Sequence, residues 1–328
     1  IVGGLLVFLK WRDKQRQKLA HPEQRVIRIW PHDRVGDIII FGLIFGILGA
    51  KLFDNLENWD RFIQDPIKNL FAPSGLTFYG GLICAAIAIC WFAKKKKINL
   101  WHLVDSAAPA LLLAYAIGRI GCQVSGDGDW GVINSAYISD TPGHAIEASP
   151  GDFEKSLANN ATYYLDGKVR DTDSSSSTVT DRTHKNLADV QHISYKAPAF
   201  FPTWFVAYTY PNNVNEDGVE IPGSEGRYSR ALPLPVFPTP VYETLACTLL
   251  FLVLWGLRKR IKISGVIFAL YLVFTGLERF FIELIRVNSE YHFFGINPSQ
   301  AEIISVILII AGFVLMFLRL KFAKTSHS

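Results

Sequence analysis

The chain has 328 residues, half of them hydrophobic, and its mean hydropathy is positive, yet charged residues make up 19% of it. That is too much charge for a chain that lies in a membrane throughout, so the charged residues must be sorted along the sequence. We attribute the formal net charge of +4 to basic segments that lie on one side of a membrane. We therefore expect no nucleic-acid partner.

Six apolar runs have the length needed to cross a bilayer, which is about 20 residues. A seventh run, residues 1–9, is too short to cross. Because the chain opens without an initiator Met and this run has no basic leader, we interpret it as the end of a truncated first helix and not as a signal peptide. The expected fold class is an all-α polytopic membrane protein with seven transmembrane helices, the first of them partial. The six long runs are residues 35–53, 76–92, 103–121, 236–257, 263–285 and 301–318.

Every second connection between these runs is basic. The basic segments are residues 10–34, 94–97 and 258–262 and the C-terminal tail, whereas the intervening connections are mixed or acidic. By the positive-inside rule the basic segments face the cytoplasm. This predicts a multi-pass membrane protein with its N-terminus outside and its C-terminus in the cytoplasm.

The pattern predicts three parts. Residues 1–131 hold transmembrane helices 1–4, residues 132–235 form an extracytoplasmic insertion, and residues 236–328 hold helices 5–7 and the cytoplasmic tail. Within the insertion, residues 195–211 alternate aromatic and small side chains as one or two strands would. Residues 171–185 are rich in serine and typical of a flexible segment. We predict a mixed, partly β insertion, with a largely disordered loop as the alternative.

Ionisable side chains within the apolar runs point to a functional site, because they are costly in hydrocarbon. At a rise of about 1.5 Å per residue, Arg119 and Arg279 each lie deep within their helices as counted from the cytoplasmic edge. Counted from the outer edge, Tyr79 lies about one turn and Tyr242 and Glu243 about two turns inside. Four helices therefore bring Arg, Glu and Tyr to the outer third of the bilayer.

The spacing of Arg279, Glu283 and Arg286 places all three on one helical face. In one interpretation Arg279 and Glu283 form an ion pair and Arg286 only extends to the membrane surface. When Arg119 is added, the cations exceed what Glu283 alone can neutralise. We then expect an external anion at the site, and a phospholipid phosphate fits the guanidinium fork.

The cysteines and histidines do not form a metal-binding pattern. Cys84, Cys90, Cys122 and Cys247 lie in or beside apolar runs without C-x-x-C spacing, and the eight histidines lack H-E-x-x-H spacing. Small apolar packing is the ordinary role of such cysteines. We expect no metal, no disulfide framework and no cofactor.

Five segments, in order along the chain, resemble motifs of the bacterial phosphatidylglycerol-prolipoprotein diacylglyceryl transferases. Residues 105–131, "DSAAPALLLAYAIGRIGCQVSGDGDWG", resemble D-x-x-A-P followed by G-R-x-G-N-F-x-N-G-E-x-W-G. "GLTFYGGL" at 75–82, "FPTPVYE" at 237–243, "ERFFIELIR" at 278–286 and "AEIIS" at 301–305 resemble G-x-S-F-H-G-G-L, H-P-[ST]-Q-L-Y-E, F-R-F-x-x-E-F-x-R and G-Q-x-L-S. Each motif is moderately specific, and five in family order are strong.

The resemblance implies an enzyme that transfers the diacylglyceryl group of phosphatidylglycerol to the lipobox cysteine of a prolipoprotein signal peptide. The products would be a thioether and glycerol phosphate. The implied partners are phosphatidylglycerol, the precursor and membrane lipid. An anion or lipid transporter, or a membrane-anchored sensor that uses the outer insertion, is the alternative.

The roles that the resemblance implies fall on the residues already singled out. Arg119 and Arg279 would clamp the leaving phosphate, and Glu283 would orient Arg279 or compete with Glu243 as the proton acceptor. Tyr79 stands where the family usually has a histidine, and because a phenol is a poor base at neutral pH, we expect it to position the substrate. The expected substrate-binding residues are Arg119, Arg286, Gly80, Gly81, Gly118, Gly121, Asp129 and Tyr242.

Two further aspartates receive structural interpretations. Asp127, like Asp129, is expected to organise the loop at the entrance of the site through turn hydrogen bonds. Asp105 lies near the cytoplasmic end of its helix, far from the arginines, and is expected to cap that helix. Glycines beside Arg119 would let a lipid headgroup approach the backbone closely.

Overall fold

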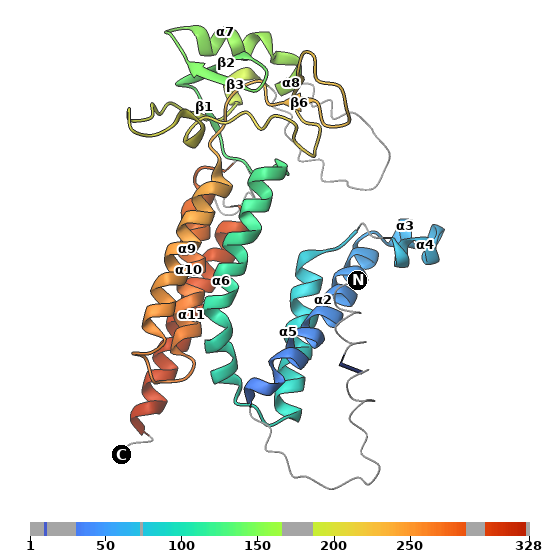
Figure 1. The fold of residues 1–328 in the computed structure, drawn as a ribbon, viewed down its shortest axis with the longest axis vertical. Helices are drawn as coiled ribbons and strands as arrows, with labels where there is room; N and C mark the ends of the chain where they lie inside the picture. The colour runs from blue at the N-terminus through green and yellow to red at the C-terminus, as the bar shows by residue number, and fades with distance from the viewer. Residues whose placement is uncertain (1–9, 12–30, 73–74, 166–185, 287–298, 326–328) are drawn as a thin grey trace. The chain divides into compact units, whose positions relative to one another are not determined.

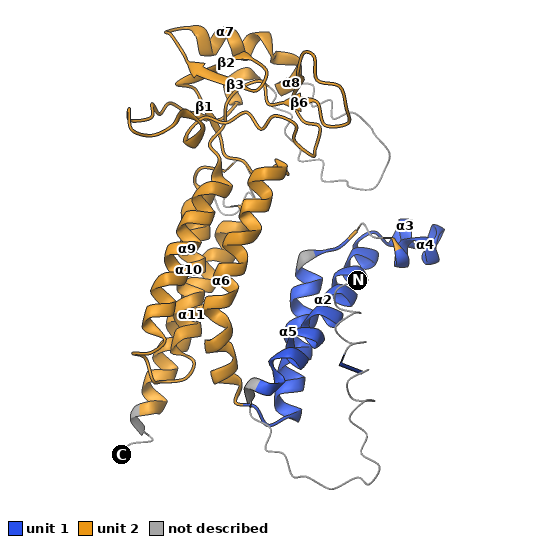
Figure 2. Cartoon of the chain, in the orientation of Figure 1, with its two compact units in different colours: residues 1–71, 76–98 blue, residues 72–75, 99–328 orange. Residues whose placement is uncertain are grey.

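The computed structural model describes residues 10–11, 31–72, 75–165, 186–286 and 299–325. It divides into two compact units, Ile1–Phe71 with Leu76–Ile98, and Ala72–Gly75 with Asn99–Ser328 (Figure 2). The predicted helix at residues 1–9 and the serine-rich stretch at 171–185 lie outside the described residues.

Unit 1 is a pair of long helices, α2 and α5, that pack along each other (Figure 1). Glycines make the close crossing possible: a Cβ atom at Gly80 would lie 2.7 Å from the carbonyl oxygen of Gly49, and one at Gly81 would lie 3.0 Å from that of Gly46. Small residues let helix backbones approach in membranes. The elements of the unit are η1 (Pro31–Arg34), α2 (Val35–Glu57), α3 (Trp59–Gln64), α4 (Pro66–Phe71) and α5 (Phe78–Lys95).

Unit 2 is built on a bundle of α6 (Leu100–Ser125), α9 (Thr239–Leu257), α10 (Val266–Glu283) and α11 (Gln300–Thr325). In this bundle α6 packs on α9 and α10 packs on α11, while α10 also contacts α6 and α9 (Figure 1). The apolar seam contains Ala108, Leu112 and Ala116 of α6 against Cys247 and Leu254 of α9. The arrangement places the end of α6, the start of α9 and the end of α10 together.

The ends of α6 follow ordinary capping rules. The side chain of Asn99 accepts hydrogen bonds from the backbone N–H groups of Trp101 and His102, 3.0 and 3.4 Å long, which satisfies donors of the first turn. Gly126 ends the helix in the left-handed region with φ of 61°, a conformation that glycine adopts without strain.

Asp105 caps a helix, but a different one from the helix we predicted. It lies inside α6, and its carboxylate accepts hydrogen bonds from the backbone N–H groups of Gly265 (2.6 Å) and Phe268 (2.8 Å) at the start of α10. The prediction that it caps its own helix was wrong because Asn99 already does so. A carboxylate one turn along α6 reaches the neighbouring helix N-terminus, where negative charge is favourable.

Between α6 and α9 the chain forms a small α+β segment. In its described residues, three two-stranded sheets pair β1 with β4 in parallel, β2 with β3 antiparallel and β5 with β6 antiparallel. Its apolar core includes Trp130, Phe153, Tyr210 and Leu234. The elements are β1 (Ile133–Asn134), β2 (Tyr137–Thr141), β3 (His144–Glu147), α7 (Asp152–Asn159), α8 (Ala161–Leu165), η2 (Leu187–Asp189), β4 (His192–Ile193), η3 (Thr203–Phe205), β5 (Val219–Glu220) and β6 (Arg230–Ala231).

The strands predicted at residues 195–211 do not form. That segment contains the short helix η3, and its one ladder contact is an isolated bridge between Tyr208 and Val236. Pro198, Pro202 and Pro211 lack the N–H group that a ladder needs. The alternating aromatic side chains pack among themselves instead, as in the stacked rings of Phe201 and Phe205 with centroids 5.1 Å apart.

The described chain is mostly helical, as predicted. Among the described residues, four helices, α2, α6, α9 and α11, are long and apolar enough to cross a membrane. Helices α5 and α10 occupy two further predicted runs, and α10 carries Glu278, Arg279 and Glu283 within its 18 residues. The count of seven transmembrane helices stays a prediction.

Replacing Gly80 with Ala should destabilise the α2–α5 pair, because the added carbon meets a neighbouring backbone. Overpacking of this kind costs about 1–3 kcal/mol, so the thermal midpoint in detergent should fall. Gly118→Ala is the matched control: a Cβ atom there meets nothing within 4 Å, and alanine favours a helix interior over glycine. Equal midpoints for the two variants would contradict the packing role of Gly80.

Candidate active site

Three guanidinium groups from separate parts of unit 2 converge on one carboxylate, that of Glu243 on α9, which is fully buried. The Nε atom of Arg119, on α6, pairs with Oε2 of Glu243. The Nη1 atoms of Arg279, on α10, and of Arg286, just after α10, lie 3.7 and 3.5 Å from Oε1. Glu243 is therefore the common partner of all the arginines that we singled out.

Asp129 is a second bridge between two of these arginines. Arg119 donates to one oxygen of Asp129 and Arg286 donates to the other. Burial alone would raise the pKa of Asp129, but Arg286 and Arg119 outweigh this and hold the pKa below its ordinary value. Asp129 is therefore ionised at neutral pH.

Backbone hydrogen bonds hold Asp129 in place. Gly131 donates to the carbonyl of Phe237 (2.8 Å), Val132 donates to that of Ile285 (2.9 Å), and the Thr239 hydroxyl donates to the carbonyl of Asp129 (2.6 Å). A Cβ atom at Gly131 would lie 2.7 Å from the carbonyl oxygen of Ile285, so only glycine fits there without a shift. The loop after α6 is thus tied to the start of α9 and the end of α10.

Glu283 supports Arg279 from the same helix. Nη2 of Arg279 lies 3.3 Å from Oε2 of Glu283, and the hydroxyl of Ser299 donates to Oε1 over 2.6 Å. The side chain of Arg279 is 26% exposed, whereas those of Arg119 and Arg286 are each 8% exposed. Arg279 is therefore the most accessible of the three cations.

We predicted that the cations at the site would outnumber the carboxylates, but the observed ion pairs do not show this surplus. Glu243, Glu283 and Asp129 balance the three guanidinium groups, because tertiary packing recruits Asp129 and Glu243 to the cluster. Two donors nevertheless remain: Nη2 of Arg119 and Nε of Arg286 are buried and have no hydrogen-bond acceptor among the described residues. Buried donors of this kind are costly, and an anion would satisfy them.

Of the predicted substrate-binding residues, Tyr242 does not meet the arginines. Its hydroxyl donates to the carbonyl of Phe205 over 2.5 Å, and its ring packs against the Phe205 ring with centroids 5.3 Å apart. This ties α9 to the segment between α6 and α9. Gly118 and Gly121 are exposed on α6, and a Cβ atom on either would meet no atom of the described residues within 4 Å.

Three predicted residues, Tyr79, Gly80 and Gly81, belong to unit 1, and the arginine cluster belongs to unit 2. Tyr79 is exposed at the start of α5, and the two glycines lie at the α2–α5 crossing. Their substrate contacts stay predictions.

Sequence analysis missed two members of the cluster. Tyr115 lies one helical turn before Arg119; its hydroxyl donates to Glu243 over 2.9 Å, and its ring centroid is 5.6 Å from the Arg119 guanidinium. Glu278 is buried close enough to Glu243 and the three arginines to interact with them electrostatically. Its Oε1 has no hydrogen-bond partner in the described part of the chain. The i, i+4 spacing from Arg119 was a signal for Tyr115. For Glu278, the signal was a carboxyl at the motif position where the family has phenylalanine.

Cys122, Asp127 and Asp129 bring ligand atoms within 4.8 Å of one another. Arg119, however, donates to both Asp129 and the Cys122 sulfur, the latter over 3.4 Å. A guanidinium group at this spot competes electrostatically with a metal cation. The expectation that no metal binds stays a prediction.

The helices and the cluster define a polytopic membrane protein with a buried arginine–carboxylate site at one end of its bundle. The family model for prolipoprotein diacylglyceryl transferase matches residues 5–318. The chain belongs to this family, as the five motifs predicted. It is a membrane transferase of lipoprotein biosynthesis, and the transporter and sensor alternatives are not favoured.

Curated relatives carry the name phosphatidylglycerol–prolipoprotein diacylglyceryl transferase. One from Enterococcus faecalis (strain ATCC 700802 / V583) is 27% identical over 290 residues, which covers 88% of this chain and 76% of the relative. One from Shouchella clausii (strain KSM-K16) is 24% identical over 302 residues, covering 92% and 80%. A shorter match to a Leptospira interrogans protein reaches 32% identity over 124 residues, or 31% of this chain and 39% of the relative.

Replacing Glu243 with Gln should strongly destabilise unit 2, because three guanidinium groups lose their common counter-charge. Breaking a buried pair by removing one partner costs about 3–5 kcal/mol, which should appear as a large fall in the thermal midpoint. Glu220→Gln is the control, since its pair with Arg230 is exposed and such pairs contribute little. Equal thermal midpoints for Glu243→Gln and Glu220→Gln would mean that Glu243 does not hold the three arginines together.

Proposed function

We propose that this chain transfers the diacylglyceryl group of phosphatidylglycerol to the thiol of a lipobox cysteine in a prolipoprotein signal peptide. The cysteine sulfur attacks the diacylglyceryl carbon bonded to the phosphate oxygen, so that a C–S bond forms and a C–O bond breaks. Glycerol phosphate leaves with the electron pair of the broken bond. The proton of the thiol passes to a base, because the thiolate is the competent nucleophile.

The observation that carries this proposal is the convergence of Arg119, Arg279 and Arg286 on Glu243. Negative charge builds on the phosphate as it leaves, and preorganised donors in a dry site stabilise such charge strongly. Nη2 of Arg119 and Nε of Arg286, which have no hydrogen-bond acceptor among the described residues, suit a phosphate oxygen. Arg279, the most exposed of the three, would meet the incoming headgroup first.

In this proposal Asp129 pairs with the guanidinium groups of Arg119 and Arg286 until the lipid binds. Its side chain is 33% exposed, and it bridges Arg119 and Arg286 as a phosphate would. When a phosphate replaces this carboxylate at the two guanidinium groups, one anion that binds through two oxygens is exchanged for another. The arginines therefore keep a negatively charged partner. Because the two arginines depress its pKa, Asp129 is a poor proton acceptor.

For the base, the contacts favour Glu278 over Glu243 and Glu283. Glu243 neutralises three guanidinium groups, and Glu283 is held by Arg279 and Ser299. Glu278 has no ion pair with any described residue, and it immediately precedes Arg279 on the same helix. It can therefore accept a proton without breaking the clamp on the phosphate.

The proposed setting is a bacterial inner membrane, with the N-terminus outside, the C-terminus in the cytoplasm and the arginine cluster toward the outer leaflet. The basic segment 258–262 lies at the end of the bundle of unit 2 opposite the cluster, as the positive-inside rule requires. Residues 132–235 would then lie outside, at the entrance of the prolipoprotein. The flanking parts 1–131 and 236–328 would hold transmembrane helices 1–4 and 5–7.

The clamp predicts that Arg119→Lys and Arg279→Lys each lose activity, because a point charge does not reproduce a planar fork. The loss of one such donor typically lowers kcat roughly 100-fold or more. The assay is mass spectrometry of a lipobox peptide incubated with phosphatidylglycerol, read as the diacylglyceryl adduct on its cysteine. Arg230→Lys is the control, since Arg230 contacts the Gly218 carbonyl in the β5–β6 hairpin. Near-normal turnover by both cluster variants, with normal thermal midpoints, would contradict the clamp.

Replacing Glu278 with Gln should lower kcat roughly 100-fold near pH 7, as expected when a general base is lost. Activity should recover toward pH about 9, where the peptide thiol ionises unaided. Glu154→Gln, on the exposed face of α7, should keep the wild-type pH–rate profile. If Glu278→Gln also kept that profile, Glu278 would have a structural role only.

A further inference from the structure

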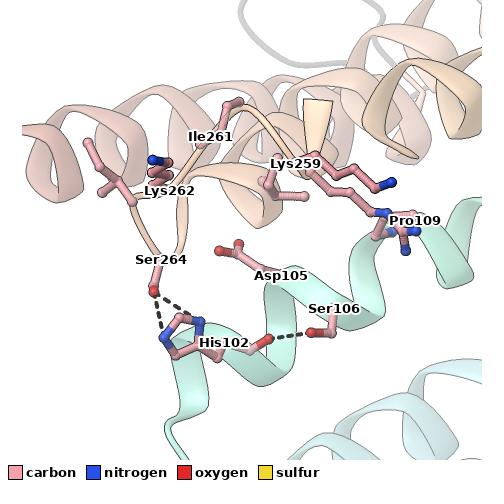
Figure 3. Close-up of a pocket in the computed structure, with 11 residues that line it drawn as sticks. His102, Asp105, Ser106, Pro109, Lys259, Ile261, Lys262 and Ser264 are labelled. Atoms are coloured by element: carbon pink, nitrogen blue, oxygen red, sulfur yellow. Dashed lines mark hydrogen bonds between the residues drawn. The ribbon is translucent and has the colours of Figure 1, made fainter. Parts of the chain in front are cut away.

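A polar cavity lies at the end of the bundle of unit 2 opposite the arginine cluster. It has a volume of about 560 Å³ and lies between the first turns of α6 and the connection from α9 to α10 (Figure 3). Ile267, in its wall, precedes Arg279 by 12 residues on α10, which is about 18 Å along a helix. The cavity is therefore separate from the arginine cluster.

The cavity carries uncompensated positive charge. Arg258, Lys259 and Lys262 line it, and none of them forms an ion pair with a carboxylate in the part of the chain that the structure describes. Asp105 is the acidic residue in its wall, and in Figure 3 it points from α6 toward the connection. Both of its oxygens already accept backbone N–H groups of α10. It therefore serves as a helix cap and leaves the three cations for another anion.

A hydroxyl group and an imidazole ring lie beside these cations. The Ser264 hydroxyl is 3.1 Å from Nε2 of His102 (Figure 3). The guanidinium of Arg258 stacks over the Trp255 ring, 3.1 Å from its centroid, and such stacking leaves the N–H edge of a guanidinium free to donate. The positive-inside rule accounts for basic residues at this end of the helices, but it does not require them to line a cavity.

The same cavity also has an apolar wall, to which Pro109, Ile261, Ile263 and Ile267 contribute. A free phosphate ester gains nothing from such a wall, whereas a lipid places its glycerol and acyl carbons there while its phosphate meets the cations. Basic pockets between membrane helices bind anionic lipid headgroups in this way. We propose that this cavity binds the phosphate-bearing headgroup of an anionic phospholipid that is not the one undergoing reaction.

The test titrates phosphatidylserine into the purified full chain in nonionic detergent and counts bound lipids by native mass spectrometry. Phosphatidylserine carries the phosphate but not the glycerol headgroup of the proposed reaction, so the result does not depend on the transferase activity. Lys259→Gln/Lys262→Gln should weaken binding of one lipid roughly 10- to 30-fold, at about 1 kcal/mol for each lysine. Arg260→Gln/Lys97→Gln removes the same charge from residues outside the cavity wall and should bind as the wild type does.

Three results would overturn the proposal. Equal affinities in the cavity variant and its charge-matched control would mean that the cavity is not the site. Equal binding of phosphatidylcholine would mean that net negative charge is not recognised. Competition by glycerol phosphate at matching affinity, with the same loss in the cavity variant, would assign the site to a soluble phosphate ester instead of a lipid. Because the substituted residues are exposed, the cavity variant and its charge-matched control should both keep the wild-type thermal midpoint. Lys259→Gln alone serves as a milder variant.

Discussion

The structure of unit 2 depends on the buried carboxylate of Glu243. A charge at this depth is costly unless it is paired and hydrogen-bonded, and here three guanidinium groups and the Tyr115 hydroxyl supply the partners. Since these partners come from α6, from α10 and from the segment after it, one carboxylate sets how the helices meet. The same pairing holds the arginines in place before any substrate is bound, so little reorganisation is needed during reaction.

The charges of the paired arginines and carboxylates in the cluster balance. Their hydrogen-bonding groups, however, are not all satisfied within the described residues. Two guanidinium N–H groups lack acceptors among the described residues, and the outermost carboxylate, Asp129, is one third exposed. In the mechanism that we propose, an anion enters by exchange with Asp129, so that no buried charge is left without a partner. Such an arrangement reconciles a stable resting state with binding of a phosphate, two demands that oppose each other in hydrocarbon.

The two ends of the bundle use aspartates in opposite ways. Asp129 neutralises arginines at one end, and its pKa falls because of them. Asp105 neutralises the N-terminus of α10 at the other end. The neighbouring cations of the α9–α10 connection have no ion pair with a carboxylate in the described part of the chain. The two proposals, the reaction at the arginine cluster and lipid binding at the second cavity, therefore concern opposite ends of one bundle, with the apolar seam of α6 and α9 between them.

The sequence by itself determined the apolar helices, the family and the arginines, because hydrocarbon selects runs of apolar residues and ionisable residues within them stand out. It also showed Glu283 as a partner of Arg279 and both Glu243 and Glu283 as candidate bases, but it did not show that Glu243 pairs with all three arginines. Only the tertiary structure decided that Asp129 bridges two arginines, that Tyr242 bonds to the Phe205 carbonyl, that Asp105 caps α10 and that Gly80 lies at a helix crossing. These are contacts between residues far apart in the chain, and residue type and local spacing carry no information on which distant group completes a hydrogen bond or fills a gap. The aromatic segment 195–211 shows the same limit: alternation suggested strands, but its prolines and the packing of its rings decided otherwise.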